Sequence, residues 1–323
     1  DLFAFLGLFE FAFKVGGSIL MADLGVNIAG VHFKNPVITA SGTFGFGQEY
    51  ARLYDISRLG GISCKGTTLK ERPGNPVPRV CETPSGILNC VGLQNPGVDA
   101  FIKDDLPFLE KSGTVIIANI AGSAEEDYVE TASRLNGTSV DMIELNISCP
   151  NVKEGGASFG TSAASVEKIT SAVKKVTEKP LMVKLTPNVT DITEMALAAE
   201  SAGADAVSLI NTLTGMIIDI NTKRPLLRNN TGGMSGAAVF PVALRMVWQT
   251  ASKVKIPVVG LGGITKWEDA VQMLLAGASA VQVGTASFTD AFAPLKIIDG
   301  INNYLDKNGY KSVSEIVGKV EPW

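Results

Sequence analysis

Met142-Ile-Glu-Leu-Asn146-Ile-Ser-Cys149-Pro-Asn151 joins an apolar run to a cysteine in a turn. The run Met142–Ile147 is typical of a buried strand, and the proline after Cys149 favours a turn there. A thiol between Asn146 and Asn151 at a strand end suits proton transfer on a planar polar ring. The alternative is a buried structural cysteine, which is the commoner role of a lone cysteine. The positions of the other polar residues in the chain distinguish between these two roles.

The strand at Met142 belongs to a series of short apolar runs. Eight runs are expected to be strands: Val37–Ala40, Gly61–Lys65, Val115–Asn119, Met142–Ile147, Leu181–Leu185, Ala206–Ile210, Val258–Leu261 and Ala280–Val283. The clearest helical periodicity between them covers Val166–Val176, Ile192–Ala202, Ala237–Lys253 and Trp267–Ala276. Eight strand–helix units in roughly 300 residues predict an α/β fold of the (β/α)8, or TIM-barrel, type.

An open doubly wound sheet is the nearest competitor for this pattern. Its G-x-G-x-x-G turn after the first strand is missing, because Gly42, Gly45 and Gly47 have a different spacing. The barrel is therefore the preferred prediction.

The N-terminal segment differs from the rest of the chain. Residues 1–20 are rich in Phe and Leu, and Met21 looks like a natural start, so we expect 1–20 to be a leader or engineered extension and 21–323 the catalytic barrel domain. The alternative is a surface-seeking amphipathic segment. Leu24–Ile28 and Val31–Phe33 predict a short β-hairpin before the barrel, in which His32 has a structural role.

The composition excludes several classes of function. Hydrophobic residues make up 46% and charged residues 19% of the 323 residues, so a sizeable core is possible, and the net charge of −4 makes nucleic acid an unsuitable partner. Cys64, Cys81, Cys90 and Cys149 form no C-x-x-C pair and there is one histidine, which argues against a zinc or iron–sulfur site in this chain. Scattered cysteines fit a cytoplasmic location, and no membrane association is expected.

Polar or glycine residues follow most of the predicted strands. They are Ser41, Gly42, Lys65, Asn119, Asn146, Cys149, Lys184, Asn211, Thr212, Gly262, Gly263, Gly284 and Thr285. In a barrel these strand ends meet at one mouth, where active sites lie, and this favours a catalytic Cys149. The long insertion after the second strand, Thr67–Gly113, is expected to be an ordered lid or pocket wall. Two more glycine-rich loops cover Asn151–Thr161 and Asn229–Gly236.

The last two strands end in glycines that precede helices. Gly262-Gly263 and Gly284-Thr285, with Gly236 before another helix, predict a phosphate site built from backbone N–H groups, although tight turns alone would also use glycine. Lys65 and Lys184 end strands two and five, where a buried cation needs an anion. These lysines could stabilise an electron-rich ring or a carboxylate, or one could form a Schiff base.

These motifs together resemble the dihydroorotate dehydrogenases. The resemblance covers Leu24 to the C-terminus and rests on Ala40-Ser-Gly-Thr-Phe-Gly-Phe-Gly47, Asn89-Cys-Val-Gly-Leu-Gln-Asn95, Asn146–Asn151, Asn211-Thr212 and Gly260-Leu-Gly-Gly263. It implies a (β/α)8 barrel that binds one FMN and oxidises (S)-dihydroorotate to orotate in de novo pyrimidine synthesis. Cys149 indicates class 1, since the membrane-associated class 2 enzymes have serine at that position. Within class 1, Gly92-Leu-Gln-Asn-Pro96 and Thr43-Phe-Gly-Phe-Gly47 make the match closer to the class 1B catalytic subunits.

The resemblance also implies roles for individual residues. Cys149 matches the general base that takes the proton from C5, while C6 delivers hydride to N5 of FMN. The positions that match orotate contacts are Lys65, Asn89, Gly92, Leu93, Asn146, Asn151, Asn211 and Thr212. The positions that match FMN contacts are Ser41, Lys65, Asn119, Asn146, Lys184, Gly236, Gly262, Gly263, Gly284 and Thr285. No role follows for Cys90.

Class 1B implies partners as well. A separate subunit carrying FAD and a [2Fe–2S] cluster would pass electrons to NAD+, in a heterotetramer of two catalytic and two electron-transfer subunits. The alternatives are a class 1A enzyme that uses fumarate, a dihydropyrimidine dehydrogenase-like module, and a flavin-free barrel lyase or aldolase with a Schiff-base lysine.

Overall fold

The computed structural model describes residues 22–148 and 159–323. Its centre is a closed barrel in which every neighbouring pair of strands is parallel, and the last strand pairs with the first. The barrel strands are β3 (Val37–Thr39), β4 (Gly61–Ser63), β7 (Val115–Ile120), β8 (Met142–Asn146), β9 (Leu181–Lys184), β10 (Ala206–Leu209), β15 (Val258–Leu261) and β16 (Ala280–Val283). This confirms the predicted (β/α)8 barrel, and each of its strands falls within a predicted run or overlaps it.

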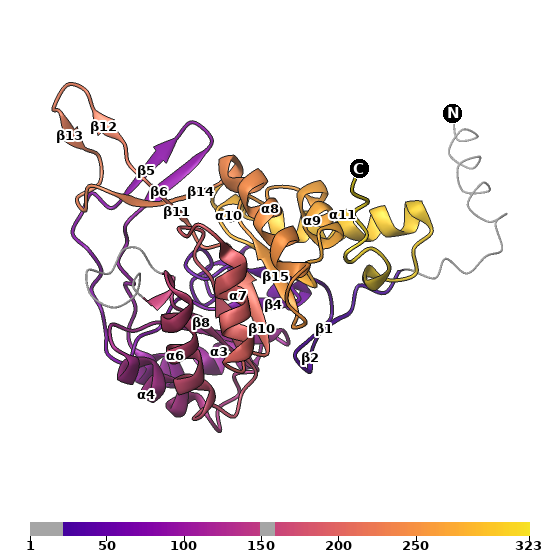
Figure 1. Ribbon diagram of the computed structural model, residues 1–323, viewed down its shortest axis with the longest axis horizontal. Coiled ribbons are helices and arrows are strands. Elements are labelled where there is room, and N and C mark those ends of the chain that lie inside the picture. Colours follow the sequence, from indigo (N-terminus) through magenta and orange to yellow (C-terminus); the bar gives the residue numbers. More distant parts are fainter. Residues whose placement is uncertain (1–21, 149–158) are drawn as a thin grey trace, which may run out of the picture.

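Helices surround the barrel (Figure 1). The helices and helical turns are η2 (Tyr50–Arg52), η3 (Ile56–Arg58), α2 (Val98–Ala100), the π-helical η4 (Phe101–Asp105), α3 (Leu106–Glu110), α4 (Glu125–Leu135), α6 (Ala163–Lys174), α7 (Ile192–Ser201), η5 (Ala237–Val239), α8 (Phe240–Ala251), α9 (Trp267–Leu275), α10 (Ala286–Thr289), α11 (Ala293–Asn308) and η6 (Val313–Glu315). The four predicted helices are present as α6, α7, α8 and α9. Helix α8 starts after the tighter turn η5, and its early proline suits a first turn, where one N–H has no partner.

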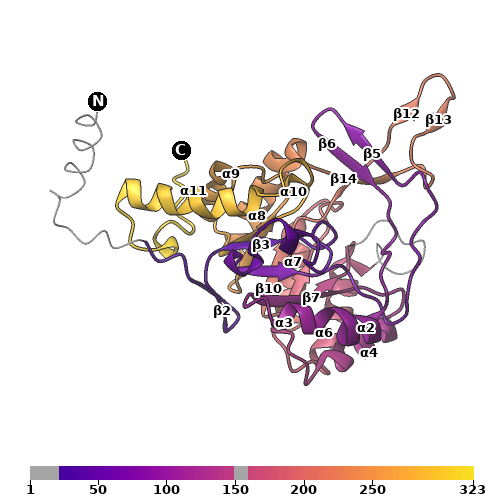
Figure 2. The same ribbon diagram turned by 180° about the vertical axis from the view of Figure 1, so that it is seen from behind.

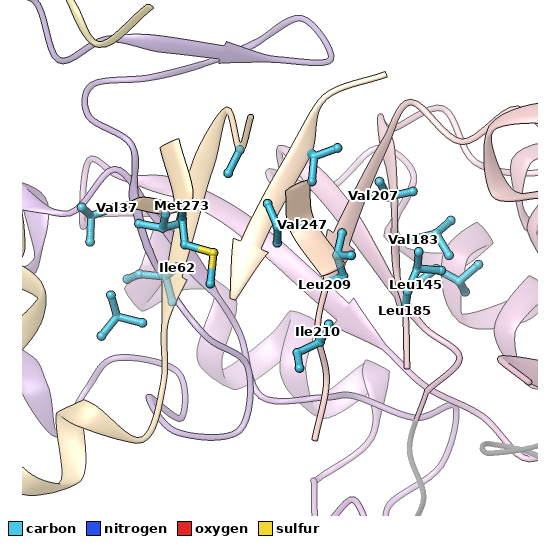
Figure 3. Close-up of a cluster of buried hydrophobic side chains, with 14 of the residues drawn as sticks. Val37, Ile62, Leu145, Val183, Leu185, Val207, Leu209, Ile210, Val247 and Met273 are labelled. Carbon is cyan, nitrogen blue, oxygen red and sulfur yellow. The ribbon is translucent and has the colours of Figure 1, made fainter. Parts of the chain in front are cut away.

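Alternation along the strands separates an apolar outer layer from the barrel interior. Leu145, Val183 and Val207 are fully buried between the strands and the helices, where they join Val247 of α8 and Met273 of α9 (Figure 3). This outer layer is the main hydrophobic core, and it holds the helices on the barrel through burial of apolar surface.

The predicted N-terminal hairpin closes the amino-terminal end of the barrel. Strands β1 (Val26–Ile28) and β2 (Val31–Phe33) pair antiparallel, and Ile28 and Phe33 are fully buried. Both side chains join a cluster with the first inward residues of the barrel strands, among them Ile38 and Ile117. Gly61 provides the room, because a Cβ there would lie 2.9 Å from the Phe33 ring. The hairpin therefore plugs the end opposite the expected active site.

The insertion after β4 is ordered, as expected, and contains regular secondary structure. It contains the hairpin β5 (Val80–Thr83) and β6 (Gly86–Asn89), and then the helical stretch α2–η4–α3. The strands join two others from the connection after β10, β11 (Leu213–Gly215) and β14 (Gly232–Ser235), in a sheet of order β11-β14-β6-β5.

A small hairpin, β12 (Ile218–Asp219) and β13 (Arg224–Pro225), extends from the same connection. In both views this lobe projects from the end of the barrel away from the β1–β2 hairpin (Figures 1 and 2). The long insertion expected after the second barrel strand is therefore present, and β6 forms the expected pocket wall.

Candidate active site

A pocket of about 420 Å³ lies at the carboxyl ends of the barrel strands, beneath the added sheet. Its size is within the range of small-molecule and cofactor sites, roughly 300–1,000 Å³. The sequence-predicted residues that line it are Ser41, Lys65, Asn89, Gly92, Leu93, Asn146, Lys184, Asn211, Thr212, Gly236, Gly262, Gly263, Gly284 and Thr285. These residues come from distant parts of the chain, and the fold brings them to one cavity.

One predicted residue lies outside the pocket lining, and two are not among the described residues. Asn119 is fully buried and does not line the pocket, but its Oδ1 accepts a hydrogen bond of 3.3 Å from Nδ2 of Asn146, which does. Cys149, the predicted base, and Asn151 lie outside the described residues. Their roles stay predictions.

A carboxylate that the sequence analysis missed lies at the centre of the barrel. Glu144 of β8 is fully buried, and four side chains donate hydrogen bonds to it. The donors come from four other strands: the Ser63 hydroxyl (2.7 Å), Nδ2 of Asn119 (2.6 Å), the Ser208 hydroxyl (2.8 Å) and Nε2 of Gln282 (2.7 Å). We call Glu144 and these four donors the carboxylate hub.

Lys184 is the cation that faces the carboxylate hub. Its Nζ lies 3.7 Å from Oε2 of Glu144, and its side chain is 4% exposed where it lines the pocket. Burial alone would raise the pKa of Glu144, but Lys184 and the hydrogen bonds from Ser63, Gln282 and Ser208 hold that pKa below its ordinary range. Glu144 is therefore an anion at neutral pH, paired with Lys184 in the floor of the pocket.

A chain of amides leads from the carboxylate hub to the strand end that precedes Cys149. Asn146 is joined to Asn119, and its Oδ1 accepts from the backbone N–H of Ser148 at 3.3 Å and from its hydroxyl at 3.1 Å. Nδ2 of Asn211 donates to the same hydroxyl at 2.7 Å. The buried charge is thus connected through neutral amides to the residue next to Cys149.

Glycines shape the rim of the pocket where β15 and β16 end. Gly263 has a φ of +74°, and a Cβ there would lie 2.6 Å from the backbone nitrogen of Phe240. Gly236 has a φ of +106° and lies against Gly86, while the hydroxyls of Ser235 and Thr285 are 2.8 Å apart. The rim therefore brings three loops and the start of η5–α8 close together, as an anion site requires.

The wall opposite the rim comes from the insertion. Nδ2 of Asn89 donates to the Gly233 carbonyl at 3.4 Å, which ties this residue to the neighbouring strand β14. Leu93 has a φ of +56°, and a Cβ at Gly92 would overlap the Asn75 carboxamide. Cys90 is fully buried against Leu88 and Leu227. Packing is therefore the structural role of this cysteine.

Gln282 is a second residue that the sequence analysis missed. It lines the pocket and is 1% exposed, and its Oε1 has no hydrogen-bond partner among the described residues. A sequence signal existed for Glu144 and Gln282, because each is a polar residue at an inward position of an otherwise apolar strand.

The described part of the chain has no cluster of side chains suited to bind a metal ion. Within residues 22–148 and 159–323, no three His, Cys, Asp or Glu side chains gather as metal ligands. No helix in these ranges combines the length and apolar character needed to cross a bilayer.

The mouth of this parallel barrel has a glycine-rich rim, two lysines and an amide floor, which consists of the carboxamides of Asn146, Asn211 and Gln282. These features define a barrel enzyme that acts on small polar molecules. The chain belongs to the dihydroorotate dehydrogenase family, whose model matches residues 23–305. This confirms the resemblance derived from the sequence motifs.

The similar proteins indicate which type of dihydroorotate dehydrogenase this chain resembles. The chain is 60% identical to "Dihydroorotate dehydrogenase B (NAD(+)), catalytic subunit" of Bacteroides thetaiotaomicron over 302 residues, which is 93% of this chain and 100% of that protein. Proteins of the same name from Phocaeicola vulgatus and Caldicellulosiruptor bescii are 57% and 55% identical; the matches cover 93% and 92% of this chain and 100% and 99% of the relatives.

Proposed function

We propose that this chain is the catalytic subunit of an NAD+-linked dihydroorotate dehydrogenase, which oxidises (S)-dihydroorotate to orotate in pyrimidine synthesis with FMN as its cofactor. The observation that carries the proposal is the single pocket that joins the glycine-rich rim to a floor of amides and a buried lysine. Relatives more than half identical over most of this chain have the matching name.

The residues present fit FMN. A flavin ring offers both N–H and carbonyl groups at its edge, and the orphaned Oε1 of Gln282 and the Lys184 ammonium supply an acceptor and a donor in the same pocket. Gly236, Gly262, Gly263, Gly284 and Thr285 would hold the phosphate through backbone N–H groups. Ser41, Lys65 and Asn146 complete the proposed FMN site, and the predicted contact Asn119 would act on it indirectly, through its hydrogen bond to Asn146.

The remaining polar groups suit an anionic pyrimidine. The carboxamides of Asn89, Asn146, Asn151 and Asn211, with the Thr212 hydroxyl, would bind the imide groups, and Lys65 would bind the carboxylate. Gly92 and Leu93 would form the wall beside the ring. Bound FMN would supply the acceptor for the hydride from C6 of the substrate, and Cys149 would act as the general base that removes the proton from C5.

The second half-reaction belongs, in this proposal, to another chain. The relatives' names say "catalytic subunit", which supports a partner subunit. We propose that this partner carries FAD and a [2Fe–2S] cluster and passes electrons to NAD+, in an assembly of two chains of each kind. The cytoplasm is the proposed location, and residues 21–323 are the proposed catalytic domain.

A Schiff-base mechanism at Lys184 is disfavoured by the carboxylate hub. A Schiff-base lysine must attack a substrate carbonyl, and Lys184 is already held in a buried ion pair with Glu144, with Nζ 3.7 Å from Oε2, that this attack would have to break. The lyase alternative therefore has less support at this residue.

The test is an absorption spectrum of the purified protein, followed by anaerobic addition of dihydroorotate. A flavin band that bleaches with substrate is the expected result. Electrons should then reach NAD+ only when the partner subunit is added, with fumarate as the control acceptor. A colourless protein that stays colourless after incubation with FMN would contradict the proposal, and turnover with fumarate alone would indicate class 1A.

A further inference from the structure

We infer that Glu144 is a positioning residue: its carboxylate fixes the direction of the Asn119 and Gln282 amides and so determines which atoms the pocket floor offers to its ligand. Glu144 does not line the pocket, and its side chain is fully buried. The inference rests on the proposed function in that FMN is the ligand used to test it.

The number of hydrogen-bond donors around Glu144 requires a carboxylate at this position. Two hydroxyls and two carboxamides donate to the two oxygens of Glu144. A carboxylate accepts at both oxygens, whereas a glutamine of the same shape accepts at only one and presents N–H groups at the other position. The four donors can therefore be satisfied together only by an anion at this position.

Each carboxamide that donates to Glu144 turns its oxygen toward other groups. The nitrogen of Gln282 is committed to Glu144, so its Oε1 is the remaining group; this oxygen has no partner among the described residues, and Gln282 lines the pocket. The nitrogen of Asn119 is committed in the same way, so its oxygen accepts from Nδ2 of Asn146.

The orientation of Asn119 in turn fixes the orientation of Asn146, on the proposed substrate side of the pocket. Because Nδ2 of Asn146 donates to Asn119, its Oδ1 faces Ser148 and Asn211. If Asn119 turned over, Asn146 would lose its acceptor and the chain would have to reverse. One buried charge thus determines the polarity of two separate parts of the floor.

The experiment measures FMN binding to the apoprotein by quenching of flavin fluorescence. Glu144→Gln should raise the FMN Kd about tenfold or more, the effect of misdirecting one or two hydrogen bonds. The matched control is Ser208→Ala, which removes one donor to the same carboxylate, keeps the charge, and does not alter a pocket-lining residue. The FMN Kd of Ser208→Ala should stay within about threefold of the wild-type value, even if the substitution lowers the melting temperature.

A double-mutant cycle separates positioning from a merely structural role. Gln282→Met removes the amide that Glu144 directs, so the losses of FMN affinity in Glu144→Gln and Gln282→Met should be less than additive in the double variant. Additive losses, or equal losses in Glu144→Gln and Ser208→Ala, would overturn the inference. If Glu144→Gln does not fold, Gln282→Met decides alone, because wild-type FMN affinity in that variant would overturn it.

The outcomes also separate this inference from the proposed function. A wild-type protein that takes up no FMN would overturn both. Wild-type protein that binds FMN, with an unchanged Kd in Glu144→Gln, would overturn the inference and leave the proposed function standing.

Discussion

If Cys149 is the general base, as proposed, its ionisation should govern the pH dependence of the chemical step. A free cysteine has a pKa of about 8.5, so the thiolate is scarce at neutral pH. Because a general base acts in its deprotonated form, the rate of flavin reduction by dihydroorotate should rise with pH and level off above the thiol pKa. Stopped-flow reduction under anaerobic conditions measures this rate. A rate that is flat from about pH 6 to 10 would contradict the role.

Removal of the thiol should separate catalysis from cofactor binding. Cys149→Ala should keep FMN but slow its reduction by roughly 10²–10⁴-fold, which is the usual effect of losing a positioned base. The control is Cys81→Ala, because Cys81 is half-buried outside the pocket lining and should leave the rate unchanged. Near-wild-type reduction in Cys149→Ala would end the assignment.

Glu144 should contribute to stability in a pH-dependent way. Despite its burial, its pKa is held below the ordinary value of 4.5, chiefly by Lys184 and by hydrogen bonds from Ser63, Gln282 and Ser208. The unfolded chain therefore binds this proton more readily, so the stabilisation is fully present above pH 4.5 and is lost as the pH falls below it. Urea midpoints measured from about pH 7 down to pH 3 should fall more steeply for wild type than for Glu144→Gln. Parallel pH profiles would refute this.

At the scale of elements, the junction between β15 and η5–α8 should be sensitive to any side chain. Gly263→Ala strains a φ of +74° and places a Cβ 2.6 Å from the Phe240 nitrogen, so the rim must open and FMN affinity should fall. Gly137→Ala is the matched control, since its φ is +71° but the space around it is open. Equal FMN dissociation constants for the two variants would contradict a rim that needs this close approach.

The β1–β2 hairpin should contribute to stability without touching chemistry. Phe33→Ala leaves a cavity beneath the barrel interior and should lower the free energy of unfolding by about 3–5 kcal/mol. His32→Ala on the exposed side of the same strand should change it by less than about 0.5 kcal/mol. Urea unfolding measures both, and the FMN Kd should stay at the wild-type value in each. A small effect of Phe33→Ala would mean that the hairpin does not close the barrel.

At the scale of the whole molecule, local patterns were enough to predict the barrel. Each strand of a parallel barrel is buried on both faces, so it appears as a continuous apolar run that needs no partner to be recognised. The strand ends then share one mouth by topology alone, which is why Lys184, Asn211 and Gly263 could be placed in one site in advance.

Long-range pairing explains what could not be predicted. The sheet of β5, β6, β11 and β14 forms from two distant insertions, and β14 is short and glycine-rich. Nothing in either segment alone indicates the other. The carboxylate hub is similar, since Glu144 receives its donors from four other strands and a single charged residue within an apolar strand does not reveal them.

The pairing of β3 with β16 has a consequence for the order of events on the ribosome. The first barrel strand leaves the ribosome long before β16, which must lie beside it, and until then one edge of the growing sheet has no partner. Gly284 and Thr285, which complete the rim, follow directly after that final strand. A nascent chain therefore has no complete site at the barrel mouth until β16 and the residues after it have left the ribosome, and the proposed FMN could be taken up only after that point.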